Sequence, residues 1–166
     1  MITATLEFAR LEFAAEPTQK IDLASLVQVL CDDYADLGEE VAVEELKATT
    51  ILAKPTSLRR ALANLIDNAL KYGLRARVSL VTTDSEARIT IHDDGPGIPP
   101  DMLDEAFKPF RRINQDHADT HVDGTGLGLS IARSIITAMG GEIALSNVGQ
   151  GGLAARVSLP LSTQGA

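Results

Sequence analysis

Residues 55–72 read PTSLRRALANLIDNALKY and form the most informative segment of the chain. Pro55 suits the first turn of a helix, where its missing N–H leaves no hydrogen bond unmade. Leu58, Leu62 and Leu65 recur at helical spacing, which predicts one apolar face packed against a core.

A second, polar stripe runs along the same predicted helix and consists of Asn64, Asn68, Lys71 and Tyr72. Residues four, seven and eight positions apart share a helical face, so these side chains are expected to point the same way. Carboxamide oxygens suit a hard cation, an ammonium suits a phosphate, and a phenol ring offers a flat surface to a base. An ordinary solvated helix face is an equally good interpretation of this stripe alone.

The sequence DDGPGI at residues 93–98 follows a predicted strand. A carboxylate at that strand end, Asp93, can accept a hydrogen bond from an exocyclic amine such as that of adenine. Gly95 and Gly97 let the backbone pass close to a ring without a Cβ clash, and Ile98 ends the segment. A simple turn is the alternative, because Gly-Pro-Gly is common in turns.

A glycine-rich segment, GTGLGLS at residues 124–130, precedes the last predicted helix. The unpaired N–H groups at a helix start can bind a phosphate. The segment is not a Walker loop, because no Gly-Lys-Ser or Gly-Lys-Thr follows. It is not a dinucleotide fingerprint either, because the aperiodic loop 108–124 precedes it instead of a strand.

The composition and charge of the chain argue against several classes of function. The chain has 166 residues, 45% of them hydrophobic and 23% charged, which predicts one folded domain. Its formal net charge of −8 argues against a nucleic-acid partner, whose phosphate backbone selects basic surfaces. No apolar run approaches bilayer length, so we expect no direct membrane contact. The single cysteine, Cys31, fits a small core residue and a reducing cytoplasm.

The apolar periodicity predicts an α+β fold in which a mixed sheet packs on about three helices as a two-layer sandwich. Asp22 is expected to cap the second helix. The predicted helices are 2–15, 22–37, 55–72, a short one at 100–106, and 126–139. The predicted strands are 41–46, 50–53, 76–82, 87–92, 142–147 and 153–159.

Taken in order, these motifs and the pair Phe107 and Phe110 resemble the nucleotide-binding domain shared by histidine kinases, gyrase-type topoisomerases, ninety-kilodalton heat-shock chaperones and mismatch-repair ATPases. The resemblance covers about residues 20–160 and is greatest to the histidine kinases. It implies the Bergerat-type ATP-binding fold, with ATP and Mg²⁺ as ligands.

The resemblance also implies roles for single residues. Asn68 would bind Mg²⁺, Asn64 would line the site, Lys71 would face phosphate and Tyr72 would pack near the nucleotide. Asp93 would take the adenine-binding role. The other implied ATP-site residues are Gly95, Gly97, Ile98, Phe110, Arg111, Arg112, Gly124, Thr125, Gly126, Leu127, Gly128 and Leu129.

Of these, Arg111 or Arg112 could reach a phosphate, and residues 126–129 would offer backbone N–H groups to the phosphates. Residues 108–123 would form the mobile ATP lid. At the position of Asn64 the ATPase members carry a general-base Glu. A carboxamide cannot take a proton from water, so fast hydrolysis is disfavoured.

The implied function is transfer of the γ-phosphate of ATP to a histidine in two-component signalling. Residues 1–16 would be the end of the dimerisation and phosphoacceptor helix, 17–162 the ATP-binding domain and 163–166 a tail. The acceptor histidine would lie upstream, so this chain should hold no catalytic side chain and should not phosphorylate itself. Expected partners are the dimerisation domain and a response regulator, in the cytoplasm or on the cytoplasmic part of a membrane-anchored sensor.

Two other functions fit the same motifs. One is an ATP-binding regulatory module or an anti-sigma-like serine kinase, although such a module needs no dimerisation helix at residues 2–15. The other is a degenerate fragment that folds but does not bind nucleotide.

Overall fold

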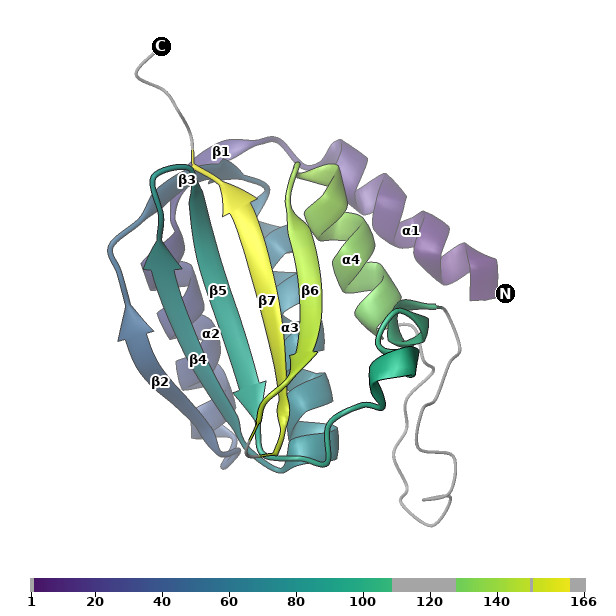
Figure 1. Cartoon of the computed structure of the whole chain (residues 1–166). Helices are drawn as coiled ribbons and strands as arrows, with labels where there is room; N and C mark the ends of the chain where they lie inside the picture. Colours follow the sequence, from purple (N-terminus) through teal and green to yellow (C-terminus); the bar gives the residue numbers. More distant parts are fainter. Residues whose placement is uncertain (1, 109–127, 150, 162–166) are drawn as a thin grey trace.

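The computed structural model describes residues 2–108, 128–149 and 151–161. They form one layer of helices against a mixed sheet (Figure 1). In chain order the elements are α1 (Ile2–Ala15), β1 (Gln19–Asp22), α2 (Leu23–Asp36), β2 (Val41–Leu46), β3 (Thr50–Ala53), α3 (Pro55–Gly73), β4 (Ala76–Thr82), β5 (Glu86–Asp93), the 3₁₀ turns η1 (Pro100–Met102) and η2 (Glu105–Phe107), α4 (Gly128–Ala138), β6 (Glu142–Asn147) and β7 (Leu153–Pro160).

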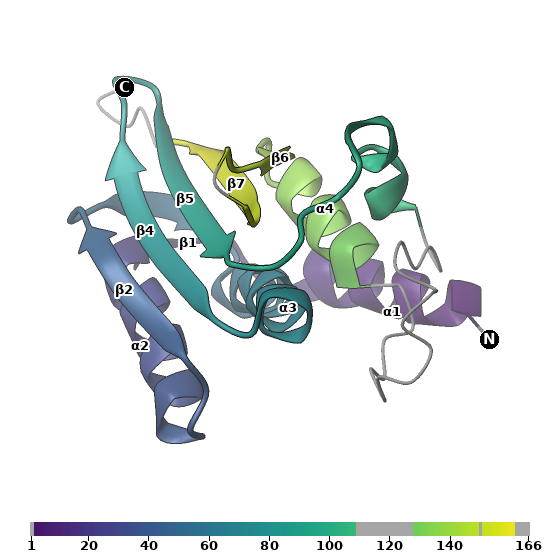
Figure 2. The same cartoon turned by 60° about the horizontal axis from the view of Figure 1, so that its bottom comes forward.

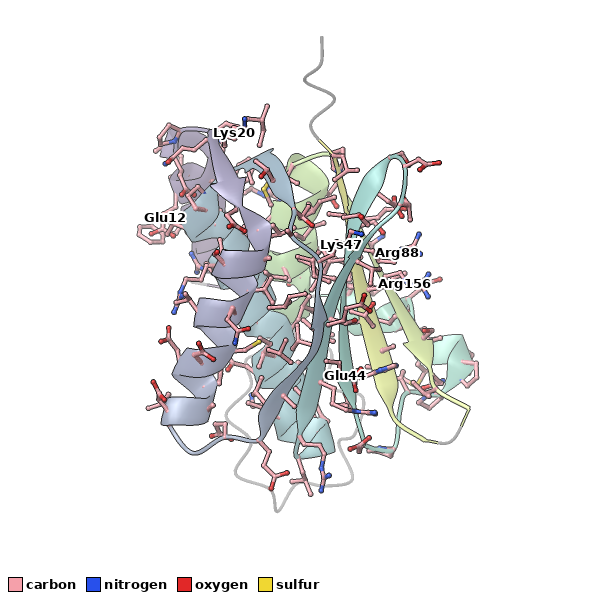
Figure 3. The ribbon with its side chains drawn as sticks, turned by 90° about the vertical axis from the view of Figure 1, so that its left-hand side faces the viewer. Glu12, Lys20, Glu44, Lys47, Arg88 and Arg156 are labelled. Carbon is pink, nitrogen blue, oxygen red and sulfur yellow. The ribbon has the colours of Figure 1, made fainter. Side chains whose placement is uncertain are left out.

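The main sheet has five strands in the order β2-β4-β5-β7-β6. Strand β2 runs parallel to β4, and the other neighbours are antiparallel. Helices α2, α3 and α4 cover one face of this sheet (Figure 2). On the open face, Arg88 and Arg156 point away from the helices (Figure 3). The predicted two-layer sandwich is therefore confirmed.

The structure differs from the predicted elements in two places. Residues 19–22 form strand β1, which the sequence analysis missed, and β1 pairs antiparallel with β3 in a separate two-stranded sheet. The predicted short helix at 100–106 is instead the two 3₁₀ turns η1 and η2. So short a segment, with Pro100 at its start, adopts the tighter i to i+3 turns.

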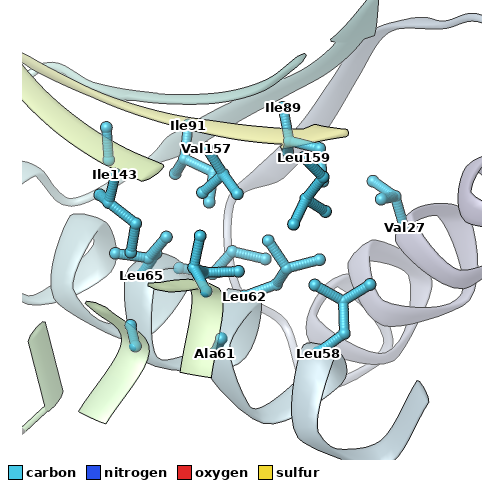
Figure 4. Packing of buried hydrophobic residues seen from close by; sticks show 14 of the residues in the cluster. Val27, Leu58, Ala61, Leu62, Leu65, Ile89, Ile91, Ile143, Val157 and Leu159 are labelled. Carbon is cyan, nitrogen blue, oxygen red and sulfur yellow. The ribbon is translucent and has the colours of Figure 1, made fainter. Parts of the chain in front are cut away.

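The apolar stripe of α3 packs into the core, as its spacing predicts. Leu58, Leu62 and Leu65 are at most 2% exposed. They face Ile89 and Val157 of the sheet (Figure 4). Burying each such side chain stabilises the fold by roughly 1.5–3 kcal/mol. This packing sets the rotation of α3 and so determines where its polar stripe points.

Helix α3 receives its N-terminal cap from a residue far away in the sequence. Lys54 at the N-cap position makes no side-chain cap hydrogen bond. Instead, Glu16 accepts hydrogen bonds from the backbone N–H groups of Thr56 at 2.7 Å and Ser57 at 2.9 Å. The Nζ of Lys54 donates to the carbonyl of Phe13 at 2.6 Å. These contacts attach the segment after α1 to the start of α3.

We predict that Glu16→Gln lowers the free energy of unfolding by about 1 kcal/mol at neutral pH. Burial raises the pKa of Glu16, but its hydrogen bonds to Ser57 and Thr56 outweigh this and leave that pKa below the ordinary value. A depressed carboxyl pKa stabilises the fold above the unfolded-state pKa. That contribution disappears as the pH falls through the folded-state pKa.

Urea unfolding of both proteins at neutral and acidic pH measures the effect. The difference in unfolding free energy between wild type and Glu16→Gln should shrink as the pH is lowered. Glu39→Gln, at an exposed position, serves as the matched control. An equal loss of stability at every pH would contradict a charged cap.

Candidate nucleotide-binding site

The centre of the candidate site is a buried carboxylate at the end of β5. Asp93 is 5% exposed. Its Oδ1 accepts hydrogen bonds from the backbone N–H of Gly95 at 2.9 Å and of Leu153 at 3.3 Å. Burial raises the pKa of Asp93 above its ordinary value, and these two N–H donors act in the opposite direction. The carboxylate is thus oriented by backbone groups of the loop after β5 and of the first residue of β7.

Glycines allow three chain segments to meet around Asp93. A Cβ on Gly73, the last residue of α3, would lie 2.3 Å from the Asp93 Cβ. A Cβ on Gly152 would lie 2.0 Å from the carbonyl oxygen of Asp93, and one on Gly95 would lie 2.5 Å from the carbonyl oxygen of Tyr72. No side chain fits at these positions, so the contacts of β5 with α3 and with the β6–β7 hairpin require glycine.

The polar stripe of α3 runs from this point toward the start of α4. Asn64 and Asn68 are half-buried, whereas Lys71 and Tyr72 near the end of α3 are exposed. A Cβ placed on Gly128, at the start of α4, would lie 3.9 Å from the Cβ of Asn64. The described parts of the three motifs are therefore neighbours along one helix.

The loop after β5 crosses the end of α3 and reaches toward α4 (Figure 2). Within it, Gly97 has a φ of 76°, which favours glycine. Ile98 bonds to Asn147 at the end of β6 through two hydrogen bonds. Farther along, Phe107 is buried, and the guanidinium of Arg133 lies 4.7 Å from the centre of its ring.

Several predicted site residues lie outside the described residues: Phe110, Arg111, Arg112, Gly124, Thr125, Gly126 and Leu127. Gly128 and Leu129 are described and lie in the first turn of α4 as the structure describes it. The arrangement of the lid and of most of the glycine-rich segment stays a prediction.

The sequence analysis missed three residues of this site: Gly73, Asn147 and Gly152. Leu153 of β7 also contributes its backbone N–H, a contact that the sequence did not predict. The glycines were visible as the end of the polar-striped helix and the start of the last strand. Nothing in the sequence signals the partner of Asn147.

The donor set fits Mg²⁺ that is held jointly with phosphate. Among the described residues, no group of three or more His, Cys, Asp or Glu side chains could hold a metal ion. Mg²⁺ commonly takes only one or two protein oxygens and completes its shell with phosphate and water. The half-buried carboxamide of Asn68 can supply one such oxygen.

No helix in the described part of the chain is long and apolar enough to cross a membrane. Cys31 is buried, as expected of a core residue, and burial raises the pKa of its thiol to about 11.

A family model, curated relatives and solved structures all match this chain, and all include histidine kinases. Residues 53–163 match the family described as histidine kinase-, DNA gyrase B- and HSP90-like ATPase. The sensor histidine kinase GtrS of Pseudomonas aeruginosa is 39% identical over 145 residues, which cover 87% of this chain and 29% of GtrS. The chain thus spans less than a third of that relative.

Two solved structures share the fold. The histidine kinase domain of the E. coli osmosensor EnvZ has a TM-score of 0.69 and 30% identity, covering 90% of this chain and 92% of that domain. Full-length ShkA in complex with AMPPNP has a TM-score of 0.75 and 25% identity, covering 95% of this chain and 35% of ShkA. The chain therefore belongs to the family of histidine kinase-, DNA gyrase B- and HSP90-like ATPases, as a histidine kinase ATP-binding catalytic domain.

Proposed function

We propose that this domain binds MgATP and donates the γ-phosphate to a histidine on a dimerisation domain outside this chain. The observation that carries the proposal is the meeting of Asp93, the polar stripe of α3 and the start of α4 along one helix. A base-reading carboxylate, carboxamide oxygens and helix N–H groups are then available to one nucleotide. The complex of the related ShkA with AMPPNP, an analogue of ATP, supports this ligand class.

Each described residue has a role that its chemistry allows. Asp93 would accept a hydrogen bond from the adenine amine through Oδ2, because Oδ1 already accepts from the backbone N–H groups of Gly95 and Leu153. Asn68 would hold Mg²⁺, which neutralises phosphate charge. Lys71 would face phosphate, and the start of α4 would offer backbone N–H groups.

The site supports transfer to another protein better than hydrolysis. Phosphoryl transfer depends mostly on positioning and on neutralising charge, so a domain can hold ATP without holding the acceptor. Asn64 on α3 carries a carboxamide, which cannot act as a general base toward water. We infer a parent sensor kinase that faces the cytoplasm and works with a response regulator, in line with relatives named as sensor kinases.

We predict that Asp93→Asn lowers ATP affinity at least tenfold. The amide keeps one oxygen for the N–H groups of Gly95 and Leu153 but replaces the other acceptor with a donor. A hydrogen bond involving a charged group contributes roughly 1.5–3 kcal/mol, and 1.4 kcal/mol is tenfold in affinity.

Calorimetric titration with ATP measures the loss. Asp94→Asn is the matched control, because it removes the same charge from an exposed neighbour. Equal affinities of wild type and Asp93→Asn would refute the adenine assignment.

Asn68→Ala should abolish the Mg²⁺-dependent part of ATP binding and leave the Mg²⁺-free part nearly unchanged. Asn68→Asp, which retains an oxygen ligand, should keep a response to Mg²⁺. Titrations with and without Mg²⁺ separate the two contributions. A full Mg²⁺ response in Asn68→Ala would show that the metal is held elsewhere.

The transfer reaction can be tested in trans with γ-labelled ATP. The chain alone should remain unlabelled. Adding a histidine-bearing dimerisation fragment of the parent kinase should give acid-labile label on that fragment, and none on its His→Gln variant. Acid-stable label on the chain itself would contradict the proposal and favour a serine kinase.

A further inference from the structure

Asn147, the last residue of β6, binds a single backbone residue with both ends of its carboxamide. The Ile98 N–H donates to Asn147 Oδ1 at 2.8 Å, and Asn147 Nδ2 donates to the Ile98 carbonyl at 2.6 Å. The Asn147 carboxamide thus exchanges two hydrogen bonds with Ile98, as a hydrogen-bonded residue pair does in an antiparallel sheet. It fixes both the position and the orientation of the Ile98 peptide groups.

The loop that starts at Asp93 is thus held at both ends. Near its start, Gly95 N–H donates to Asp93 Oδ1 at 2.9 Å, and at its far end Ile98 is held by Asn147. Between them, a Cβ on Gly97 would lie 2.4 Å from Asn147 Oδ1. Gly97 therefore permits the close approach that the Asn147 pairing needs.

The same hairpin also holds the carboxylate. Asn147 lies opposite Leu153 in the β6–β7 register, and Leu153 N–H donates to Asp93 Oδ1 at 3.3 Å. The turn between them is closed by Val148 N–H, which donates to the Gly152 carbonyl at 3.0 Å. The end of the β6–β7 hairpin therefore contacts the Asp93 carboxylate directly and its following loop through Asn147.

We propose that Asn147 is a positioning residue that sets how strictly the site selects adenine, acting through Ile98 and the loop back to Asp93. The inference rests on the proposed nucleotide function. Without the Asn147 pairing, the loop between Asp93 and Ile98 gains alternative conformations. The Asp93 carboxylate then keeps only the Leu153 N–H as a fixed donor, and its orientation toward a base amine becomes less well defined. Contacts to the triphosphate come from α3 and α4, which Asn147 does not hold.

The test compares ATP with inosine triphosphate, which has an oxygen in place of the exocyclic amine, on the whole chain with Mg²⁺. Wild type should prefer ATP. In Asn147→Ala the ATP-to-ITP affinity ratio should fall about tenfold through weaker ATP binding, with ITP affinity changed less than about twofold. A residue that only stabilised the fold would leave this ratio unchanged.

Ser146→Ala, one residue earlier on the exposed edge of β6, is the matched control and should keep the wild-type ratio. If Asn147→Ala does not fold, Asn147→Asp answers the same question. Its carboxylate keeps the acceptor for Ile98 N–H but loses the donor to the Ile98 carbonyl, and the ratio should fall at least about threefold.

The proposed function and the role of Asn147 can be refuted separately. A wild-type protein that binds neither nucleotide would overturn the proposed function, and this inference with it. A wild-type protein that prefers ATP, together with an unchanged ratio in the Asn147 variants, would overturn the inference alone.

Discussion

The buried carboxylate of Asp93 is the constraint on which the candidate site depends. Burying a carboxylate is unfavourable unless donors replace the lost water, and here backbone N–H groups of Gly95 and Leu153 do so. Asp93 fits among these segments because Gly73 leaves room for its side chain and Gly152 leaves room for its backbone carbonyl. The position of one carboxylate thus fixes how α3, the loop after β5 and the β6–β7 hairpin meet.

Helix α3 connects the core to the site. Its buried leucines determine its rotation against the sheet, and that rotation directs Asn64 and Asn68 to the side where α4 begins. Its first turn is capped by Glu16 from the segment after α1, and its last residue touches Asp93. Core packing, the Glu16 cap and the candidate site therefore all depend on one helix.

Elements with a strong local pattern could be predicted from the sequence, and those that depend on distant partners could not. The helix predicted at 55–72 is α3 at Pro55–Gly73, because leucine spacing and an N-terminal proline are local signals. Strand β1, with side chains largely exposed, forms by pairing with β3. The Asn147–Ile98 contact joins residues 49 positions apart, and no local pattern encodes such a contact. Predictions for residues 109–127 lie outside the described residues and stay predictions.

The charge distribution explains how an acidic chain can suit a polyphosphate. The net charge is −8, and arginines of the open sheet face lie next to acids, with Arg77 Nη2 3.0 Å from Asp94 and Arg88 Nη2 2.6 Å from Glu86. Such solvent-accessible pairs contribute little to stability beyond local charge neutralisation. Recognition of the phosphates at the candidate site would rest instead on Lys71, backbone N–H groups, a carboxamide and a metal, all at close range. Nucleotide selectivity would then depend on how precisely glycines and hairpin contacts position the backbone, and not on the overall charge of the surface.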